Sequence, residues 1–214
     1  MLCLVLACTL VQQAFGICVQ CARPTEMLQV ARLLQGTFSA DANPVSAALI
    51  VAENVAGLLE RIDSNLMLVA RCDGADERVV GFVELLLPAW LASDDASSYP
   101  DRIRRQQHPC IYSLTVDPGM RTRGIATKLM RSAELQARDM GFSRIVLEVE
   151  DSNDAALSLY AKLGYTEVAR YEGRKLVGDI LFGRSEAITK NSLEKVLTPI
   201  QGSIRQIDAP QAVL

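Results

Sequence analysis

The chain has 214 residues, enough for one domain that buries a substantial core. Half of the residues are hydrophobic and 22% are charged, a composition typical of a folded globular protein and unlike that of a disordered or fibrous one. The net charge of −3 and a pI near 5.3 offer no basic surface, so we expect no nucleic-acid partner. Six cysteines are too few for a disulfide-stapled scaffold of this length.

Residues 1–15 contain no charged side chain. Their apolar run is too short to cross a bilayer, so we expect no integral membrane association. A secretory signal peptide would begin with basic residues, which this segment lacks. The readings left open are a targeting or extension segment, a buried first strand and a gene-model artefact.

The first half of the chain alternates between strand and helix patterns. Thr25, after Arg23-Pro24, is predicted to cap the first helix. The predicted elements are a strand at 16–23, a helix from 26, a helix at 45–62, and a hairpin of strands 66–72 and 78–87 around a turn at 73–76.

Residues 88–109 lack clear periodicity, and we interpret them as a loop over a functional face or a disordered insertion. His108 is the single histidine, and its place before Pro109 favours a loop residue over a catalytic base. Cys18 and Cys21 have metal-ligand spacing, but in a strand their side chains point to opposite faces, so no metal site is expected.

The second half of the chain contains two units of strand and helix, which predicts a mixed α/β sheet with helices on both faces. Beyond Arg184 the pattern weakens, and we expect a short helix near 192–197 followed by fraying. The predicted elements are a strand at 111–116, a helix at 124–140, a strand at 143–149, a helix at 154–163, and a closing pair at 165–171 and 176–182.

The most informative segment lies between the strand that ends at Val116 and the helix that begins near Gly124. The first turn of a helix presents amides without partners at the positive end of its dipole, and small residues let an anion approach the backbone. Gly124 and Ala126 are small, and Arg121 and Arg123 add positive charge. The segment therefore predicts a phosphate site, although it matches neither a Walker loop nor a Rossmann fingerprint.

Arg121-x-x-Gly124-x-Ala126, after Val116-x-Pro118, is similar to the coenzyme A signature of the GNAT acetyltransferase superfamily. The resemblance implies acetyl-CoA as co-substrate, with its pyrophosphate on the loop amides. It also implies that a backbone amide near residues 114–116 stabilises the negative charge on the acyl oxygen. The resemblance assigns coenzyme binding to Leu114, Thr115, Val116, Arg121, Thr122, Arg123, Gly124, Ile125, Ala126 and Thr127.

A second segment resembles the next motif of that superfamily, N-x-x-A-x-x-L-Y-x-x-x-G-F/Y. The residues that match it are Asn153, Ala156, Leu159, Tyr160, Gly164 and Tyr165. By resemblance, Asn153, Ala156 and Tyr160 contact the coenzyme, and Tyr160 is the general acid. The implied fold is the GNAT α/β fold, a mixed and mostly antiparallel sheet of six to seven strands over residues 16–183, followed by a tail at 184–214.

An amine must lose a proton before it attacks a thioester, so a base is also needed. The stretch Leu147-Glu148-Val149 before the second motif is similar to the bacterial ribosomal-protein alanine acetyltransferases, which implies Glu148 as the base. A solvent-facing or ion-paired Glu148 is the structural alternative, and Glu84 is another candidate base. The reaction requires no metal, and none is expected.

Residues 26–62, 88–109 and 171–180 are the regions that set acceptor choice in the superfamily, and they carry no diagnostic motif here. Residues 58–83 resemble plastid GNAT enzymes that acetylate protein N-termini and lysines, so the first hypothesis is a protein or peptide amine in the chloroplast. The alternatives are a small-molecule amine, a module that binds acyl-CoA without turnover, and a cytoplasmic location.

Overall fold

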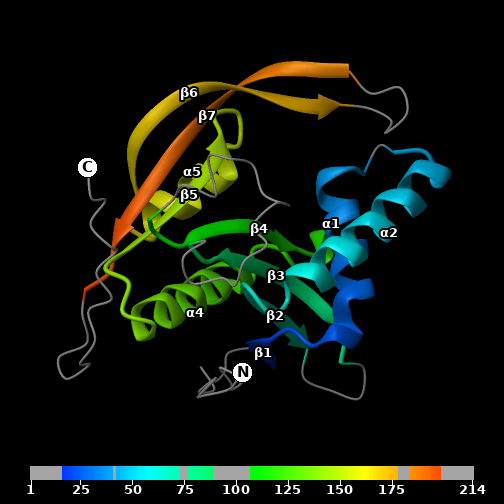
Figure 1. Cartoon of the computed structure of the whole chain (residues 1–214), viewed down its shortest axis with the longest axis horizontal. Helices are drawn as coiled ribbons and strands as arrows, with labels where there is room; N and C mark the ends of the chain where they lie inside the picture. Colours follow the sequence, from blue (N-terminus) through cyan, green and yellow to red (C-terminus); the bar gives the residue numbers. More distant parts are fainter. Residues whose placement is uncertain (1–15, 41, 73–76, 89–106, 178–183, 199–214) are drawn as a thin grey trace, which may run out of the picture. The chain divides into compact units, whose positions relative to one another are not determined.

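The structure is a computed structural model that describes residues 16–40, 42–72, 77–88, 107–177 and 184–198. A seven-stranded sheet runs in the order β1-β2-β3-β4-β5-β7-β6 and is joined by helices α1, α2, α4 and α5 (Figure 1). This arrangement confirms the predicted mixed α/β class and the mostly antiparallel sheet. The described residues form two compact units: those within 16–84 and 113–132 belong to the first, and the others belong to the second.

Strands β1 (Ile17–Cys21) and β2 (Leu66–Cys72) pair antiparallel in the first unit, and β3 (Val79–Leu86) is the next neighbour of β2. These three strands are confirmed close to their predicted limits. All of β3 is buried, as expected for a strand covered on both faces. The predicted turn at 73–76 lies outside the described residues.

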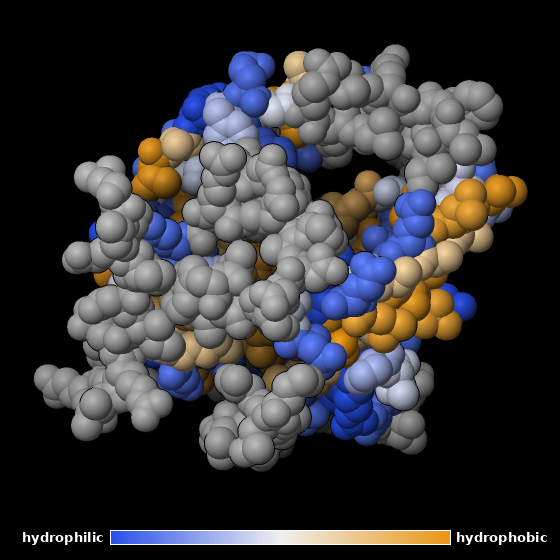
Figure 2. Space-filling view, viewed as in Figure 1, coloured by the Kyte–Doolittle hydropathy of each residue, from blue (hydrophilic) through white to orange (hydrophobic). Residues whose placement is uncertain are grey.

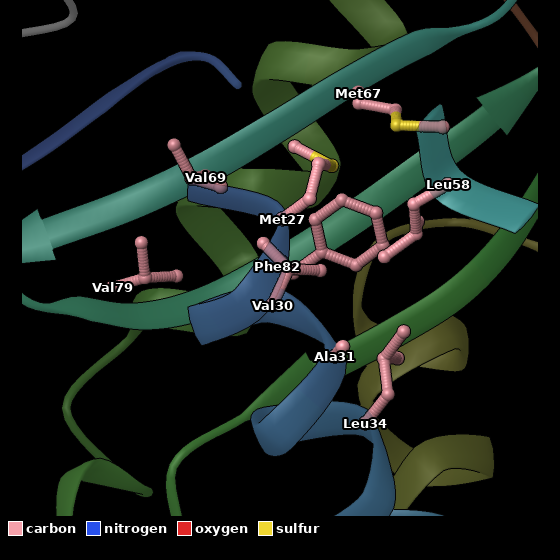
Figure 3. Close-up of a cluster of buried hydrophobic side chains, with 9 residues drawn as sticks. All are labelled: Met27, Val30, Ala31, Leu34, Leu58, Met67, Val69, Val79 and Phe82. Carbon is pink, nitrogen blue, oxygen red and sulfur yellow. The ribbon is translucent and has the colours of Figure 1, made fainter. Parts of the chain in front are cut away.

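Helices α1 (Met27–Phe38) and α2 (Pro44–Arg61) cover one face of these strands. Figure 3 shows that α1 directs apolar side chains toward Phe82 of β3. Position 81 lies on the opposite face of the sheet from Phe82, because successive residues of a strand face opposite sides. A Cβ at Gly81 would lie 3.0 Å from methyl groups of both Ile125 and Leu129 in α4 (Ile125–Asp139), so that helix packs directly on the second face. The predicted helices on both faces are therefore present in this unit.

The predicted cap of the first helix is wrong. Thr25 lies in a short 3-10 turn, Pro24–Glu26, and the carboxylate of Glu26 accepts a hydrogen bond from the Arg23 amide at 2.7 Å. Glu26 is buried because Arg71 of β2, also buried, donates to both of its oxygens at 2.5 and 2.7 Å. Glu26 stands at the N-cap of α1, but its carboxylate is engaged by the buried cation and forms no cap hydrogen bond to the helix.

The second unit contains β5 (Arg144–Glu150), α5 (Asp154–Lys162), β6 (Thr166–Val177) and β7 (Arg184–Val196). Strand β7 pairs antiparallel with both β5 and β6. In Figure 1 the pair β6–β7 forms a long two-stranded ribbon.

Residues 184–196, assigned to a tail by the sequence, thus belong to the sheet. The predicted helix near 192–197 is wrong, and the closing partner of β6 is β7 instead of residues 176–182. Leu193 and Leu197 have helical spacing, but hydrogen bonds on both edges of β7 decide the conformation. Residues 1–15, 89–106, 178–183 and 199–214, on which other expectations fall, lie outside the described residues.

No helix in the described part of the chain has both the length and the apolar composition needed to span a membrane.

Candidate active site

Strand β4 (Cys110–Val116) leads into the predicted phosphate loop, and its backbone is irregular. Its parallel register with β5 covers Cys110 and Ile111, after which Ser113 adopts a φ of 53°. A non-glycine residue in the left-handed region interrupts the extended conformation and disturbs the alternation of the strand. This irregularity, which the sequence did not reveal, immediately precedes residues 114–116, where the resemblance implies an amide that faces the acyl oxygen.

Thr115 is buried, and its hydroxyl lies 2.6 Å from the hydroxyl of Thr37 near the end of α1. The side chain is thus engaged within the first unit, so any role of Thr115 toward a coenzyme falls to its backbone.

The loop after β4 is held at its start by Asp117. Its amide donates to the Val80 carbonyl at 2.9 Å, and its carboxylate accepts from the Gly119 amide and from Arg78, both at 2.8 Å. Arg121 donates to the carbonyl of Val116 at 3.3 Å. These bonds fasten the base of the loop to β3 and β4.

Two residues of this loop have left-handed backbones, Thr122 with a φ of 61° and Gly124 with a φ of 75°. Helix α4 (Ile125–Asp139) begins directly afterwards. Within the described residues, the amides of residues 122–127 donate no hydrogen bond to another part of the chain. Successive free amides at the positive end of a helix form a concave anion site.

The residues of this loop fit the phosphates of a coenzyme. Arg123 and Gly124 are exposed, Ala126 is half-buried, and the buried Ile125 anchors the helix. The predicted loop and helix are thus both present. Helix α4 carries an apolar stripe that is buried apart from the half-buried Ala126: Ile125, Leu129, Met130, Ala133 and Ala137.

Helix α5 in the second unit is capped at both ends. The Asn153 side chain accepts from the Ala156 amide at 3.2 Å, and Gly164 ends the helix with a φ of 85°. The amide of Tyr165 donates to the Tyr160 carbonyl at 3.0 Å, which completes a Schellman motif together with the Gly164 amide. Asn153 and Ala156 are therefore joined to each other by the cap, and this cap sets the position of α5.

Tyr160 lies in the last turn of α5, and only 7% of it is exposed. Burial, with a smaller effect of the nearby Cys110 thiol, raises the pKa of Tyr160 to about 12. Among the described residues none forms a hydrogen bond with its hydroxyl, which leaves that proton available for transfer. Its ring lies 5.8 Å from the ring of Tyr165, tilted by 60°.

Sequence reasoning missed an ion pair beside the Tyr165 ring, between a buried glutamate and a half-buried lysine. Lys195 of β7 donates to Glu134 of α4 at 2.6 Å and lies 5.6 Å from the centre of the Tyr165 ring. Burial, followed by the charge of Glu134, raises the pKa of Tyr165 far above its ordinary value. The one sequence signal was Glu134 itself, a charged residue inside the apolar stripe of α4.

The two candidate bases have different surroundings. Glu148 of β5 is 17% exposed, and its carboxylate is 3.9 Å from the Lys190 ammonium of β7, a loose ion pair. Glu84 of β3 is fully buried and accepts hydrogen bonds from Arg61 at 3.0 and 3.3 Å and from Asn65 at 3.1 Å. Because both oxygens of Glu84 are occupied out of contact with solvent, Glu148 is the better candidate.

The structure also places the single histidine of the sequence. His108 lies in the bend before β4, as predicted, and burial, with the charge of Arg144 as a smaller effect, lowers its pKa. Across the described ranges, no three His, Cys, Asp or Glu residues gather as metal ligands.

Known structures share this fold. A putative acetyltransferase from Salmonella typhimurium, solved with its cofactor acetyl-CoA, aligns with 88% of this chain and 98% of its own at a TM-score of 0.58 and 18% identity. At 18% identity this likeness shows a shared fold and nothing more.

Curated relatives match over shorter regions. Streptothricin acetyltransferase from Streptomyces lavendulae is 30% identical over 110 residues, half of each chain. The ribosomal protein bS18 alanine N-acetyltransferase of Haemophilus ducreyi is 34% identical over 58 residues, 27% of this chain and 40% of its own. The chain spans half or less of the length of these relatives.

The sequence model of the Acetyltransferase (GNAT) family matches residues 29–165, well over half of the chain. This region contains β2–β5, α4 and α5, and therefore both the amide-rich loop and Tyr160. The chain belongs to the GNAT acetyltransferase family.

Proposed function

We propose that this protein is an acetyl-CoA-dependent N-acetyltransferase that acts on a protein amine, either an N-terminal α-amine or a lysine. The observation that carries the proposal is the loop before α4, where left-handed Thr122 and Gly124 leave a run of amides unpaired. A protein acceptor is supported by the likeness of the chain to the bS18 alanine N-acetyltransferase of Haemophilus ducreyi, which names a ribosomal protein as its acceptor.

The coenzyme would be held by the amides of residues 122–127, with the exposed Arg123 adding positive charge. Bound acetyl-CoA would supply an acetyl group activated as a thioester. Backbone amides of residues 114–116, after the irregular Ser113, would donate to the acyl oxygen as it gains negative charge.

Tyr160 and Glu148 would divide the two proton transfers. Tyr160 keeps its proton at neutral pH because its pKa is about 12, so it can donate to the departing thiolate. Glu148, a partly exposed carboxylate, would accept the proton that the attacking amine must lose. Both charges are thereby avoided: the amine attacks uncharged, and the thiol leaves protonated.

The experiment follows release of free coenzyme A from acetyl-CoA with α-amine peptides, internal-lysine peptides and polyamines as acceptors. Tyr160→Phe is expected to lower kcat on the peptide substrate by about 100-fold, and Glu148→Gln by about 10- to 100-fold. Tyr165→Phe and Glu150→Gln are matched controls, because each makes the same chemical change at a neighbouring residue. Equal losses in the controls would contradict the assigned roles.

A small-molecule amine is the second candidate acceptor, favoured by the likeness to streptothricin acetyltransferase over half of each chain. Turnover confined to polyamines or aminoglycoside-like amines would support that alternative and contradict a protein acceptor. Saturable binding of acetyl-CoA without turnover on any acceptor would instead identify a binding module.

We propose a chloroplast location on the resemblance of residues 58–83 to plastid enzymes. Imaging of the full chain fused at its C-terminus to a fluorescent protein in plant cells tests this. A diffuse cytoplasmic signal would favour the alternative.

A further inference from the structure

Helix α2 has the composition of a buried helix in an exposed position. Three of its 18 residues are charged, Glu53, Glu60 and Arg61, and only Ser46 and Leu58 are buried. A helix that covers a core from the surface normally carries a polar outer face, whereas a helix that is apolar all round is normally enclosed. Within the part of the chain that the structure describes, the outer face of α2 is therefore exposed despite its apolar composition.

The exposed apolar residues of α2 lie on one face. Val45 is 69% exposed, Leu49 45% and Leu59 44%, and alanines fill the positions between them. Steps of three and four residues place all of them along a single stripe. We call this set the α2 stripe: Val45, Ala48, Leu49, Ala52, Ala56 and Leu59. Figure 2 shows hydrophobic residues gathered along this helix.

We propose that the α2 stripe is the interface through which two copies of this chain associate, with the two α2 helices antiparallel about a twofold axis at Ala52. A twofold interface must be self-complementary, since each copy presents the same surface. The α2 stripe meets this condition: Val45 and Leu59 lie seven residues on either side of Ala52, and Ala48 and Ala56 lie four residues on either side. Val45 therefore meets Leu59, and each alanine meets an alanine. Leu49 lies level with Val55 of the partner subunit, an apolar residue that is half-buried against its own core.

The small central residues determine how closely the helices approach. Alanine at 48, 52 and 56 allows two helix axes to come within about 8 Å, the short end of the usual range. Val45 and Leu59 then close the two ends of the contact. An interface of one helix per copy is small, so we expect a dimer with a Kd on the order of micromolar.

The charges at the border of the α2 stripe favour a second copy over a lipid surface. In the antiparallel register Glu60 is level with Pro44 of the partner subunit, where the first turn of a helix favours negative charge. A helix that lies on a membrane carries Lys or Arg along its polar face. The one cation of α2, Arg61, is paired with Glu84.

Sedimentation equilibrium of the full chain at increasing concentration tests the association. Leu49→Glu is expected to raise the dimer Kd by about tenfold or more, because it places a charge in the contact. Leu28→Glu is the matched control, since Leu28 of α1 is 46% exposed and lies outside the α2 stripe. A monomer at all concentrations up to about 1 mM, or equal effects of the two variants, would overturn the proposal.

Oxidative cross-linking identifies the occupant. The thiol of Ala52→Cys should form a disulfide with its equivalent in a second copy, found by mass spectrometry of the digested dimer, whereas that of Glu53→Cys should not. A disulfide between position 52 and Cys3 or Cys8 of the same chain would show that the N-terminal segment covers the stripe and would overturn the proposal. Binding of the monomer to lipid vesicles would also overturn the proposal if Leu49→Glu abolishes that binding.

Discussion

Gly124 and Thr122 occupy the same left-handed region of backbone space, but only one of them suits it. A Cβ at Gly124 would meet no atom within 4 Å, so Gly124→Ala acts through its φ alone. We expect a loss of about 1 kcal/mol of stability and a higher KM for acetyl-CoA, measured by thermal unfolding and initial rates. Thr122→Gly should leave stability unchanged or raise it slightly, because it removes a β-branched side chain from a left-handed backbone position. Destabilisation by both variants would contradict this account.

Tyr160 permits a prediction about pH. Its pKa is raised from the ordinary 10 to about 12 by burial, so the phenol remains protonated over a wider range than a free tyrosine. If Tyr160 is the acid, kcat should show no alkaline loss between pH 8 and about 10, where an ordinary tyrosine begins to ionise. The measurement is the pH profile of kcat on the peptide substrate. An alkaline limb near pH 10 that disappears in Tyr160→Phe would contradict the raised pKa.

At the scale of elements, Arg61 joins the last turn of α2 to β3 through the buried Glu84. Arg61→Met would leave this carboxylate without its cation, and we expect a loss of about 3 kcal/mol in urea unfolding. Arg170→Met is the control, because its pair with Asp151 is exposed on both sides, and its loss should have little effect. Similar losses would show that the Glu84 ion pair stabilises α2 no more than a surface contact.

The contact of β2 with the start of α1 depends on Glu26. Burial alone would raise the pKa of Glu26, but hydrogen bonds from Arg71 and the Arg23 amide, with their charges, lower it below its ordinary value. A lowered folded pKa stabilises the protein above the unfolded pKa near 4.5, and this contribution is lost as pH falls through the folded pKa. Glu26→Gln should therefore reduce stability at pH 7 and flatten its dependence on pH below about 4.5. An unchanged acid slope in urea unfolding would contradict the assignment.

For the whole molecule, the decisive segment is β7, which lies between β5 and β6 in the sheet. A chain that ends after residue 183 keeps the domain limits expected from sequence but removes this strand. We expect it to be insoluble or unfolded, because β5 and β6 each lose a paired neighbour. A chain that ends after residue 198 retains β7 and should unfold cooperatively, as followed by circular dichroism. Folding of the shorter chain would contradict a structural role for β7.

Much of the fold and of the candidate site could be predicted because local patterns were strong. Strands β1 to β3 alternate or are continuously apolar between turn residues, and α5 has Asn153 to begin it and Gly164 to end it. The loop before α4 was readable since small residues follow a strand end. In each case the residues that favour the element lie within it or directly beside it in the sequence.

Other features needed partners distant in the chain. The sequence alone determined the mixed α/β class, the amide-rich loop and the capped helix that carries Tyr160. Only the tertiary structure decided that residues 184–196 form a strand, that Glu26 pairs with Arg71 at the start of α1, and that Glu134 meets Lys195. These outcomes depend on backbone pairing and buried charge compensation between remote segments, whose energies outweigh local propensity and leave no mark in a local pattern.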